Sequence, residues 1–136
     1  MLRQVVDEAR ADFDPAAAAW TDAMPDDLEA HANPALLARL LHALYENAIQ
    51  AAAPRAPSVV TRARREAERM IIEVADDGPG VPPAIAATLF EPLVTARPGG
   101  TGLGLALARR IAIAHGGSLV LEPAACGATF RLELPP

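Results

Sequence analysis

The clearest hydrophobic pattern in the chain begins at Pro34. Apolar side chains recur there at intervals of three and four residues, which places them on one face of a helix. They are Leu36, Leu37, Leu40, Leu41, Leu44, Tyr45, Ala48, Ile49 and Ala52. Asn33 and Pro34 are residue types favoured at the N-cap and in the first turn, whereas Pro54 does not fit inside a helix. The pattern predicts a long helix that begins at Pro34 and ends before Pro54.

Two shorter segments have the same helical periodicity. Residues 1–13 predict a short amphipathic helix. Its apolar side is formed by Leu2, Val5, Val6 and Ala9. Residues 103–115 predict a further helix, which Gly116 and Gly117 end because glycine is favoured just beyond a helix C-terminus. Residues 14–33 contain two prolines and predict a loop with one or two short strands.

Strand-like patterns occur in two pairs. Residues 59–63 and 69–75 are short apolar stretches on either side of the charged residues 64–68, which predicts a hairpin with a turn over residues 64–68. Residues 118–122 and 128–134 predict a second pair of strands. This order of helices and strands predicts an α+β fold. We expect a two-layer α/β sandwich with a mixed, mostly antiparallel sheet covered by helices on one face.

The composition suits one domain of this kind and argues against several classes of function. The 136 residues are 51% apolar, and a chain of this size buries a core without needing metals or disulfides, so residues 1–136 are expected to form a single domain. Cys126 is the only cysteine, which indicates a reducing compartment such as the cytoplasm. The net charge of −5 argues against nucleic acid as a partner. No apolar run approaches the roughly 20 residues of a membrane span, so we expect no membrane contact.

An acidic turn follows the predicted strand 69–75. Its sequence is Asp76-Asp77-Gly78-Pro79-Gly80. A buried carboxylate at a strand end can accept a hydrogen bond from an exocyclic amine such as that of adenine, and neighbouring glycines let a base approach closely. The same residue types are also typical of an ordinary turn after a strand. Residues 76–104 as a whole show no convincing periodicity and predict an unusually long loop, of the kind that commonly serves function.

A glycine-rich run leads into the helix predicted at 103–115. It reads Gly99-Gly100-Thr101-Gly102-Leu103-Gly104-Leu105. Exposed backbone N–H groups and the positive end of a helix dipole suit a polyphosphate. The run is not a Walker A loop, because no Lys-Ser or Lys-Thr follows it, and it lacks the strand and spacing of a dinucleotide fingerprint. Another kind of nucleotide site is therefore indicated.

Asn47 lies at the edge of the apolar stripe of the long helix, where an amide either faces a cleft or bonds only to water. Four motifs follow one another along the chain: an Asn on a helix, the acidic turn, Phe90-Glu91-Pro92 and the glycine-rich run. In this order they resemble the histidine-kinase branch of the superfamily of gyrase, heat-shock chaperone, MutL and histidine-kinase ATPases. The resemblance covers roughly residues 26–135. It implies a Bergerat-type ATP-binding fold with ATP and Mg²⁺ as cofactors.

The resemblance also implies roles for individual residues. Asn47 would ligate the magnesium ion and act in catalysis, and Asp76 would hold the adenine amino group. Further nucleotide contacts are implied for Gly78, Gly80, Arg97, Gly100, Thr101, Gly102, Leu103, Gly104 and Thr129. Within this set, Gly78 and Gly80 would shape the base pocket and Thr129 would lie beside adenine and Asp76. The core motifs would occupy residues 34–134, and an ATP lid would cover about residues 80–102.

The sequence departs from the family pattern at two positions that bear on chemistry. Arg97 replaces a lysine of many relatives, in a chain whose twelve basic residues are all arginine; it either faces phosphate or is a solvated charge of the lid. Ala43, one helical turn before Asn47, replaces an Asn of many kinases and the catalytic Glu of hydrolysing relatives. Glu46 is a poor substitute, because it points about 100° away from Asn47 on the helix.

The resulting functional hypothesis is a protein histidine kinase that has only its catalytic domain in this chain. It would donate the γ-phosphate of ATP to a histidine on separate dimerisation helices of a parent kinase, and serve a response regulator indirectly. The parent protein could be membrane-anchored with this domain in the cytoplasm. Two alternatives stay open: a protein serine kinase of the anti-sigma-factor type, and a regulatory domain that binds nucleotide without catalysis.

Overall fold

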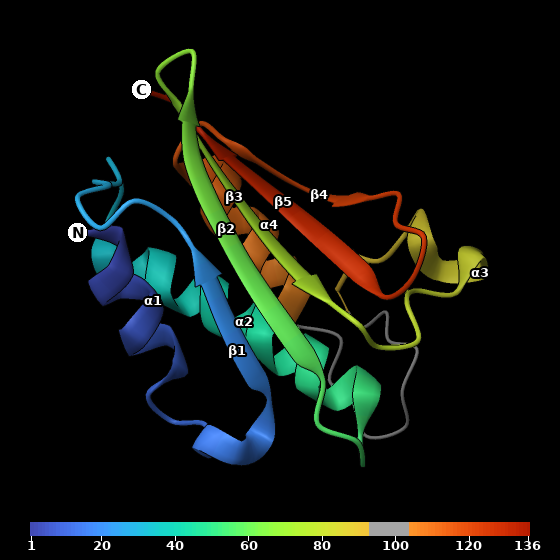
Figure 1. The fold of residues 1–136 in the computed structure, drawn as a ribbon. Coiled ribbons are helices and arrows are strands. Elements are labelled where there is room, and N and C mark those ends of the chain that lie inside the picture. Colours follow the sequence, from blue (N-terminus) through green and yellow to red (C-terminus); the bar gives the residue numbers. More distant parts are fainter. Residues whose placement is uncertain (93–103) are drawn as a thin grey trace.

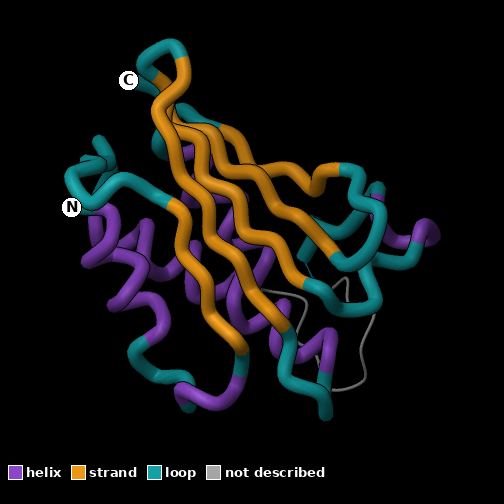
Figure 2. Tube along the Cα trace, viewed as in Figure 1, coloured by secondary structure: helices purple, strands orange, loops and turns teal. Residues whose placement is uncertain are grey.

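One mixed sheet forms the front layer of the molecule, and helices cover its rear face (Figure 1, Figure 2). The computed structural model describes residues 1–92 and 104–136. In these residues the five strands lie in the order β1-β2-β3-β5-β4. They are β1 (Ala19–Ala23), β2 (Ser58–Glu66), β3 (Arg69–Asp76), β4 (Ser118–Glu122) and β5 (Ala128–Leu134). β1 is parallel to β2 and the other pairs are antiparallel. The predicted two-layer sandwich with a mixed, mostly antiparallel sheet is confirmed.

The helices of the described residues agree closely with the three predicted helical segments and include two further short ones, in segments predicted as loops. They are α1 (Leu2–Arg10), α2 (Pro34–Ala52), α3 (Pro83–Ala86) and α4 (Gly104–Ala114), with a short 3-10 helix at Pro15–Ala17. The Asn33 side chain accepts a hydrogen bond from the Leu36 N–H at 3.1 Å, which confirms the predicted N-cap. None of the helices in the described part of the chain has the length and apolarity needed to cross a membrane.

The two glycines after α4 end it as the sequence predicts. Gly116 has φ +76°, and its N–H donates to Ile113 O at 2.9 Å. The Gly117 N–H donates to Ala112 O, also at 2.9 Å, and this pair of bonds satisfies carbonyls that the helix end would otherwise leave unpaired. His115, which follows α4, connects this helix to α2, because its Nε2 accepts the N–H of Asn33, the N-cap of α2, at 3.2 Å. The end of α4 is thereby held at the start of α2.

The core lies between the sheet and the helix layer. Side chains of a strand alternate between faces, and in β5 the inward-facing residues are buried while those between them are half-buried. The inward-facing side chains of β3 are Met70, Ile72, Val74 and Asp76, and those of β5 are Ala128, Phe130, Leu132 and Leu134. They pack with the apolar side of α2, of which Leu41, Leu44 and Tyr45 are almost completely buried. Asp76 is thus the polar end of an otherwise apolar row.

The hairpin of β2 and β3 has a shorter turn than the sequence indicated. The prediction of a turn over residues 64–68 is wrong, because β2 continues to Glu66 and only Ala67 and Glu68 form the turn, with φ values of 50° and 69°. Positive φ at both central residues is the geometry of tight hairpins. The charges do not interrupt the strand, since Arg64 donates to Glu73 at 2.7 Å and to Glu66 at 2.9 Å.

The predicted loop over residues 76–104 contains more structure than its sequence suggested. Pro83–Ala86 forms the short helix α3, and Leu89 is buried against the core. The ring of Phe90 meets Phe130 edge-on, with 6.0 Å between centroids, and the Arg109 guanidinium lies 5.6 Å from the Phe90 centroid. This part of the expected lid is therefore tied to β5 and α4. The remaining part, residues 93–103, lies outside the described residues.

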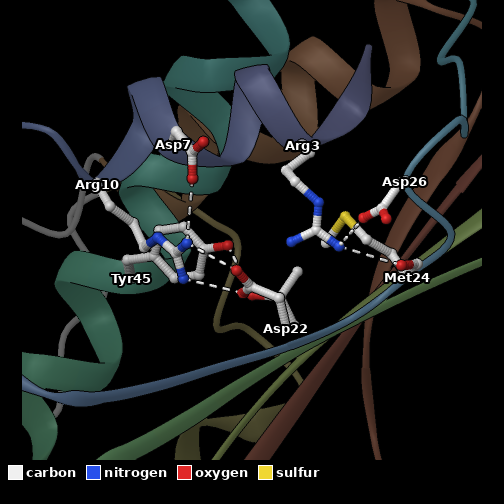
Figure 3. A network of polar contacts seen from close by, with 8 residues as sticks. Arg3, Asp7, Arg10, Asp22, Met24, Asp26 and Tyr45 are labelled. Atoms are coloured by element: carbon white, nitrogen blue, oxygen red, sulfur yellow. Dashed lines mark hydrogen bonds and ion pairs between the residues drawn. The ribbon is translucent and has the colours of Figure 1, made fainter.

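A polar network connects α1 to β1 at the edge of the sheet (Figure 3). Arg10 donates to both carboxylate oxygens of Asp22, at 2.9 and 2.7 Å, and also bonds to Asp7. Arg3 bonds to the Met24 carbonyl and to Asp26. Both members of the Arg10–Asp22 pair are largely buried, with side-chain exposures of 16% and 14%. Paired charges of this kind are costly to break one at a time, so this network holds α1 against the parallel edge strand.

The only tyrosine of the chain supplies a test of this packing. Tyr45 is fully buried and shares a 2.7 Å hydrogen bond with Thr61. Burial is the main cause that raises the pKa of Tyr45 from 10.0 to about 12. The hydrogen bond with Thr61 lowers this pKa, but by less than burial raises it. The folded state therefore binds the proton more tightly, and this contribution to stability is present below pH about 10 and lost as pH rises towards 12.

We expect the phenolate absorbance of the folded chain to emerge only near pH 12, or together with unfolding. An alkaline titration monitored by ultraviolet absorbance measures this, and the fluorescence of Trp20, the only tryptophan, reports whether the chain is still folded. Ionisation near pH 10 in a chain that is still folded would contradict the buried environment of Tyr45.

Candidate nucleotide-binding site

Asp76 lies at the end of β3, in the centre of the sheet. The register sets it opposite Val59 of β2 and Ala128 of β5. Its side chain lies on the helix-facing side of the sheet and the residue is 9% exposed, and Oδ1 accepts the Gly78 N–H at 2.9 Å. Burial raises the pKa of Asp76 above its ordinary value, although the N–H groups of Gly78 and Ala128 partly oppose that shift. A buried carboxylate of this kind is a strong hydrogen-bond acceptor for a ligand.

Asp77 differs sharply from its neighbour. Its side chain is exposed, and Oδ1 accepts the Ser58 N–H at 2.8 Å. Arg55 donates to the same carboxylate at 3.3 Å and to the Asp77 carbonyl at 2.9 Å. These bonds, with the Ser58 N–H first, lower the pKa of Asp77. Of the two adjacent acids, only Asp76 faces the interior.

Three glycines bring the backbone close around Asp76. A Cβ at Gly127 would lie 1.8 Å from the Asp76 carbonyl oxygen, and Gly127 has φ +67°. A Cβ at Gly80, whose φ is +81°, would lie 3.0 Å from the Gly127 carbonyl oxygen, and a Cβ at Gly78 would lie 3.0 Å from Asp76 Oδ1. The acidic turn and the turn before β5 are therefore in direct backbone contact. Gly127 was not among the predicted site residues, and its only sequence signal is a glycine directly before a strand.

Asn47 is a buried residue of α2, the helix whose last turn borders the acidic turn. It is 8% exposed. A Cβ at Gly78 would lie 3.8 Å from Ala52 Cβ, so the last turn of α2 touches the acidic turn. A Cβ at Gly104 would lie 3.9 Å from Ala43 Cβ, so the start of α4 touches the same helix one turn before Asn47. The structure thus places Asn47 on α2 between the acidic turn and the first residue of α4.

The structure does not bring Thr129 together with Asp76. The register pairs Thr129 with Ala75, whereas Ala128 is the residue opposite Asp76. Paired residues of antiparallel strands share a face, and successive residues alternate. Thr129 therefore lies on the outer face of the sheet, away from the Asp76 carboxylate, and the expectation that it lies beside that group is wrong.

Five of the residues expected to contact nucleotide lie outside the described residues. They are Arg97, Gly100, Thr101, Gly102 and Leu103. Gly104 is described and is the first residue of α4. The described site therefore consists of Asp76, Gly78 and Gly80, with Asn47 and Gly104 at its α2 and α4 sides.

Comparison with known sequences decides the family. The profile of the histidine kinase-, DNA gyrase B- and HSP90-like ATPase family matches residues 32–136. The chain belongs to this ATPase family. The chain is 33% identical to the sensory histidine kinase/phosphatase NtrB of Escherichia coli O157:H7 over 113 residues. This alignment covers 76% of the chain and 32% of NtrB. NtrB of Rhodobacter capsulatus is 50% identical over 64 residues, which are 47% of the chain and 18% of that protein.

Solved structures agree with the family. The nucleotide-free catalytic domain of histidine kinase ThkA has a TM-score of 0.86 and 25% identity, covering 98% of the chain and 91% of that domain. Full-length ShkA in complex with AMPPNP has a TM-score of 0.76 and 29% identity, covering 98% of the chain and 29% of ShkA. The expected fold of a histidine-kinase ATPase domain is confirmed. The chain spans about a third or less of the NtrB proteins it matches.

Proposed function

We propose that this chain binds Mg-ATP at the end of β3 and presents the γ-phosphate to a histidine on separate helices, as the catalytic domain of a sensor kinase in two-component signalling. One observation carries the proposal: the buried Asp76 carboxylate, surrounded by closely packed glycines, in a chain of the histidine-kinase ATPase family. The curated relatives named above are sensory histidine kinases. The acceptor helices and the response regulator belong to the proposal as its partners.

Asp76 is proposed to recognise adenine. A buried carboxylate that already accepts the N–H groups of Gly78 and Ala128 can still accept a further donor, such as the exocyclic amine of the base, because its two oxygens offer about four acceptor positions. Gly78 and Gly80 leave the space that side chains would otherwise fill on the turn. Burial of Asp76 makes such a hydrogen bond selective, because a ligand lacking the amine leaves a buried acceptor without that bond.

Asn47 is proposed to ligate magnesium. In the described chain, no group of three His, Cys, Asp or Glu side chains is arranged to hold a metal ion. Magnesium is commonly held by one or two protein oxygens together with phosphate oxygens and water. The amide oxygen of Asn47 fits that role only with nucleotide present, so the ion would enter the site with ATP. Bound there, magnesium would neutralise charge on the phosphates.

Replacement of Asn47 by Ala should remove the magnesium dependence of nucleotide binding. We expect Asn47→Ala to bind a non-hydrolysable ATP analogue equally well with and without Mg²⁺, whereas the unaltered chain binds it about tenfold more tightly with the ion, since one charge-assisted contact is worth about 1.5 kcal/mol. Calorimetry in the two buffers measures this. Glu46→Gln, a change at the adjacent exposed position, is the matched control. An unchanged magnesium effect in Asn47→Ala would remove Asn47 from the metal site.

The described residues offer no base for attack by water near Asn47. Ala43 presents a methyl group one turn before Asn47, and the start of α4 packs against it. Glu46 is directed instead to His42, with 3.5 Å between Oε2 and Nε2. Activation of water needs a base within hydrogen-bond reach of it, whereas a histidine acceptor supplies its own nucleophilic nitrogen. Positioning of the phosphates then contributes most of the catalysis.

Incubation with radiolabelled ATP tests the complete proposal. We expect the chain alone to release phosphate slowly and to carry no label. An added histidine-bearing helical domain from the parent protein should acquire acid-labile label. Acid-stable label on an added protein serine would instead favour the serine-kinase alternative, and rapid phosphate release by the chain alone would favour a hydrolase. Binding without transfer to any acceptor would leave a regulatory nucleotide-binding domain.

A further inference from the structure

The connection between α2 and β2 is bound to the acidic turn by a compact set of hydrogen bonds. Arg55 donates through Nη1 to Asp77 Oδ1 at 3.3 Å and through Nη2 to the Asp77 carbonyl at 2.9 Å. Ser58 donates its N–H to Asp77 Oδ1 at 2.8 Å, and the Asp77 N–H donates to the Ser58 carbonyl at 3.3 Å. The N–H, the carbonyl and the carboxylate of Asp77 all have partners in residues 55–58. We name this set the Asp77 latch.

The latch acts on the one residue that separates Asp76 from Gly78. Asp76 is fixed by the sheet through its pairing with Val59 and Ala128. The Gly78 N–H, which donates to Asp76 Oδ1, belongs to the peptide whose carbonyl is that of Asp77. Arg55 holds that carbonyl. The orientation of this peptide therefore sets the direction of the Gly78 N–H towards the Asp76 carboxylate.

We propose that Arg55 and Asp77 are positioning residues of the nucleotide site: by holding the peptide between Asp77 and Gly78, they aim the Gly78 N–H at Asp76 and keep the carboxylate in its ligand-binding orientation. This inference rests on the proposed binding of adenine by Asp76. Neither Arg55 nor Asp77 is proposed to contact the nucleotide itself. Their role is to keep the turn in the competent conformation before the ligand arrives.

The expected effect is on affinity more than on stability. The Arg55 and Asp77 side chains are about half exposed, at 53% and 48%, and a single ion pair at such a site adds little to folding. The apparent affinity of a site falls in proportion to the fraction of molecules that are competent to bind. If loss of the latch leaves about a fifth of the molecules with the turn in place, the affinity falls about fivefold.

A matched pair of arginine variants separates this role from general loss of charge. Arg55→Ala breaks the latch. Arg69→Ala breaks a similar surface pair at the other end of β3, where Arg69 Nη1 lies 3.3 Å from Oε1 of Glu133 in β5. Calorimetry with Mg²⁺ and a non-hydrolysable ATP analogue should give an affinity about fivefold lower for Arg55→Ala and within twofold of the unaltered chain for Arg69→Ala. Asp77→Asn keeps an oxygen for the Ser58 N–H, so its affinity should lie between those of Asp77→Ala and the unaltered chain.

Hydrogen exchange of the Gly78 amide in nucleotide-free protein tests the positioning directly. It should accelerate severalfold in Arg55→Ala and Asp77→Ala, and stay unchanged in Arg69→Ala, while the amide of Gly117 at the end of α4 is unaffected in all of them. Equal Gly78 exchange and equal affinity in Arg55→Ala would overturn the latch. If the unaltered chain binds no nucleotide, the proposed function fails, and Gly78 exchange alone then decides whether the latch orients the turn.

Discussion

Asp76→Asn should lower the affinity for a non-hydrolysable ATP analogue roughly 10- to 100-fold. The substitution keeps the shape of the side chain and replaces a charged acceptor with an amide, and a hydrogen bond to a charged group is worth about 1.5 to 3 kcal/mol. An amide oxygen can still accept the Gly78 N–H, so the turn should keep its conformation. Calorimetry measures the affinity. Asp26→Asn, at a side chain that is 90% exposed, is the control and should bind as the unaltered chain does.

The same variant should not lose stability. Burial raises the pKa of Asp76, so the folded state binds this proton more tightly than the unfolded chain does. That contribution to stability is fully present below the unfolded pKa and is lost as pH rises through the folded pKa. At neutral pH the charged form therefore costs stability, and the neutral amide removes the cost. A urea midpoint of Asp76→Asn at or above that of the unaltered chain is expected, and a large decrease would mean that its lost affinity reports damage to the fold.

Gly127→Ala should destabilise the fold by about 4 kcal/mol or more, which is a large share of the typical stability of a domain. The added Cβ would lie 1.8 Å from the Asp76 carbonyl oxygen and 3.1 Å from Asp77 Cα. Both contacts are with backbone, so relief requires β5 to separate from the acidic turn. The φ of +67° adds about 1 to 2 kcal/mol for a residue with a Cβ. Urea unfolding measures the effect.

Gly116→Ala is the matched control for that substitution. Gly116 also has a positive φ, +76°, but the nearest atom to an added Cβ is Pro135 Cγ at 3.6 Å, an ordinary contact. This variant should lose only the conformational part, about 1 to 2 kcal/mol. The difference between the losses of unfolding free energy in the two variants measures the cost of the clash with the backbone at Asp76. Equal losses would show that β3 and the turn before β5 are not packed as described.

The sequence predicted most elements of the fold, because their signals are local. The N-cap at Asn33 and the glycines after α4 depend on residues within one helical turn, and both agree with the structure. The hairpin turn was predicted too long because four of the five residues 64–68 are charged, and charge suggested contact with solvent. In the structure Arg64 bonds diagonally to Glu73, the residue opposite Arg62, on the outer side of the sheet, so a charged segment extends the strand. Cross-strand pairing is not visible until the register is known.

The site was predictable only in part, for a related reason. Asp76 could be chosen from its position after an apolar strand, and the structure places it in the buried end of that strand. Thr129 could not be placed, because a shift of one residue moves a side chain to the other face. The contacts of Gly127 and of the Arg55–Asp77 pair could not be predicted, since they join segments far apart in the sequence. Sequence identified the chemical groups, and the register determined which of them meet.

Amide chemical-shift mapping by NMR, during titration of the chain with Mg²⁺ and a non-hydrolysable ATP analogue, tests the central claim most directly. We expect the largest changes at Asn47, at the acidic turn from Asp76 to Gly80 and at Gly127, because these surround the proposed base and metal positions. The outer face of the sheet, represented by Glu73 and Arg131, should change little. Changes confined to that outer face, or none at saturating analogue, would contradict a nucleotide site at the end of β3.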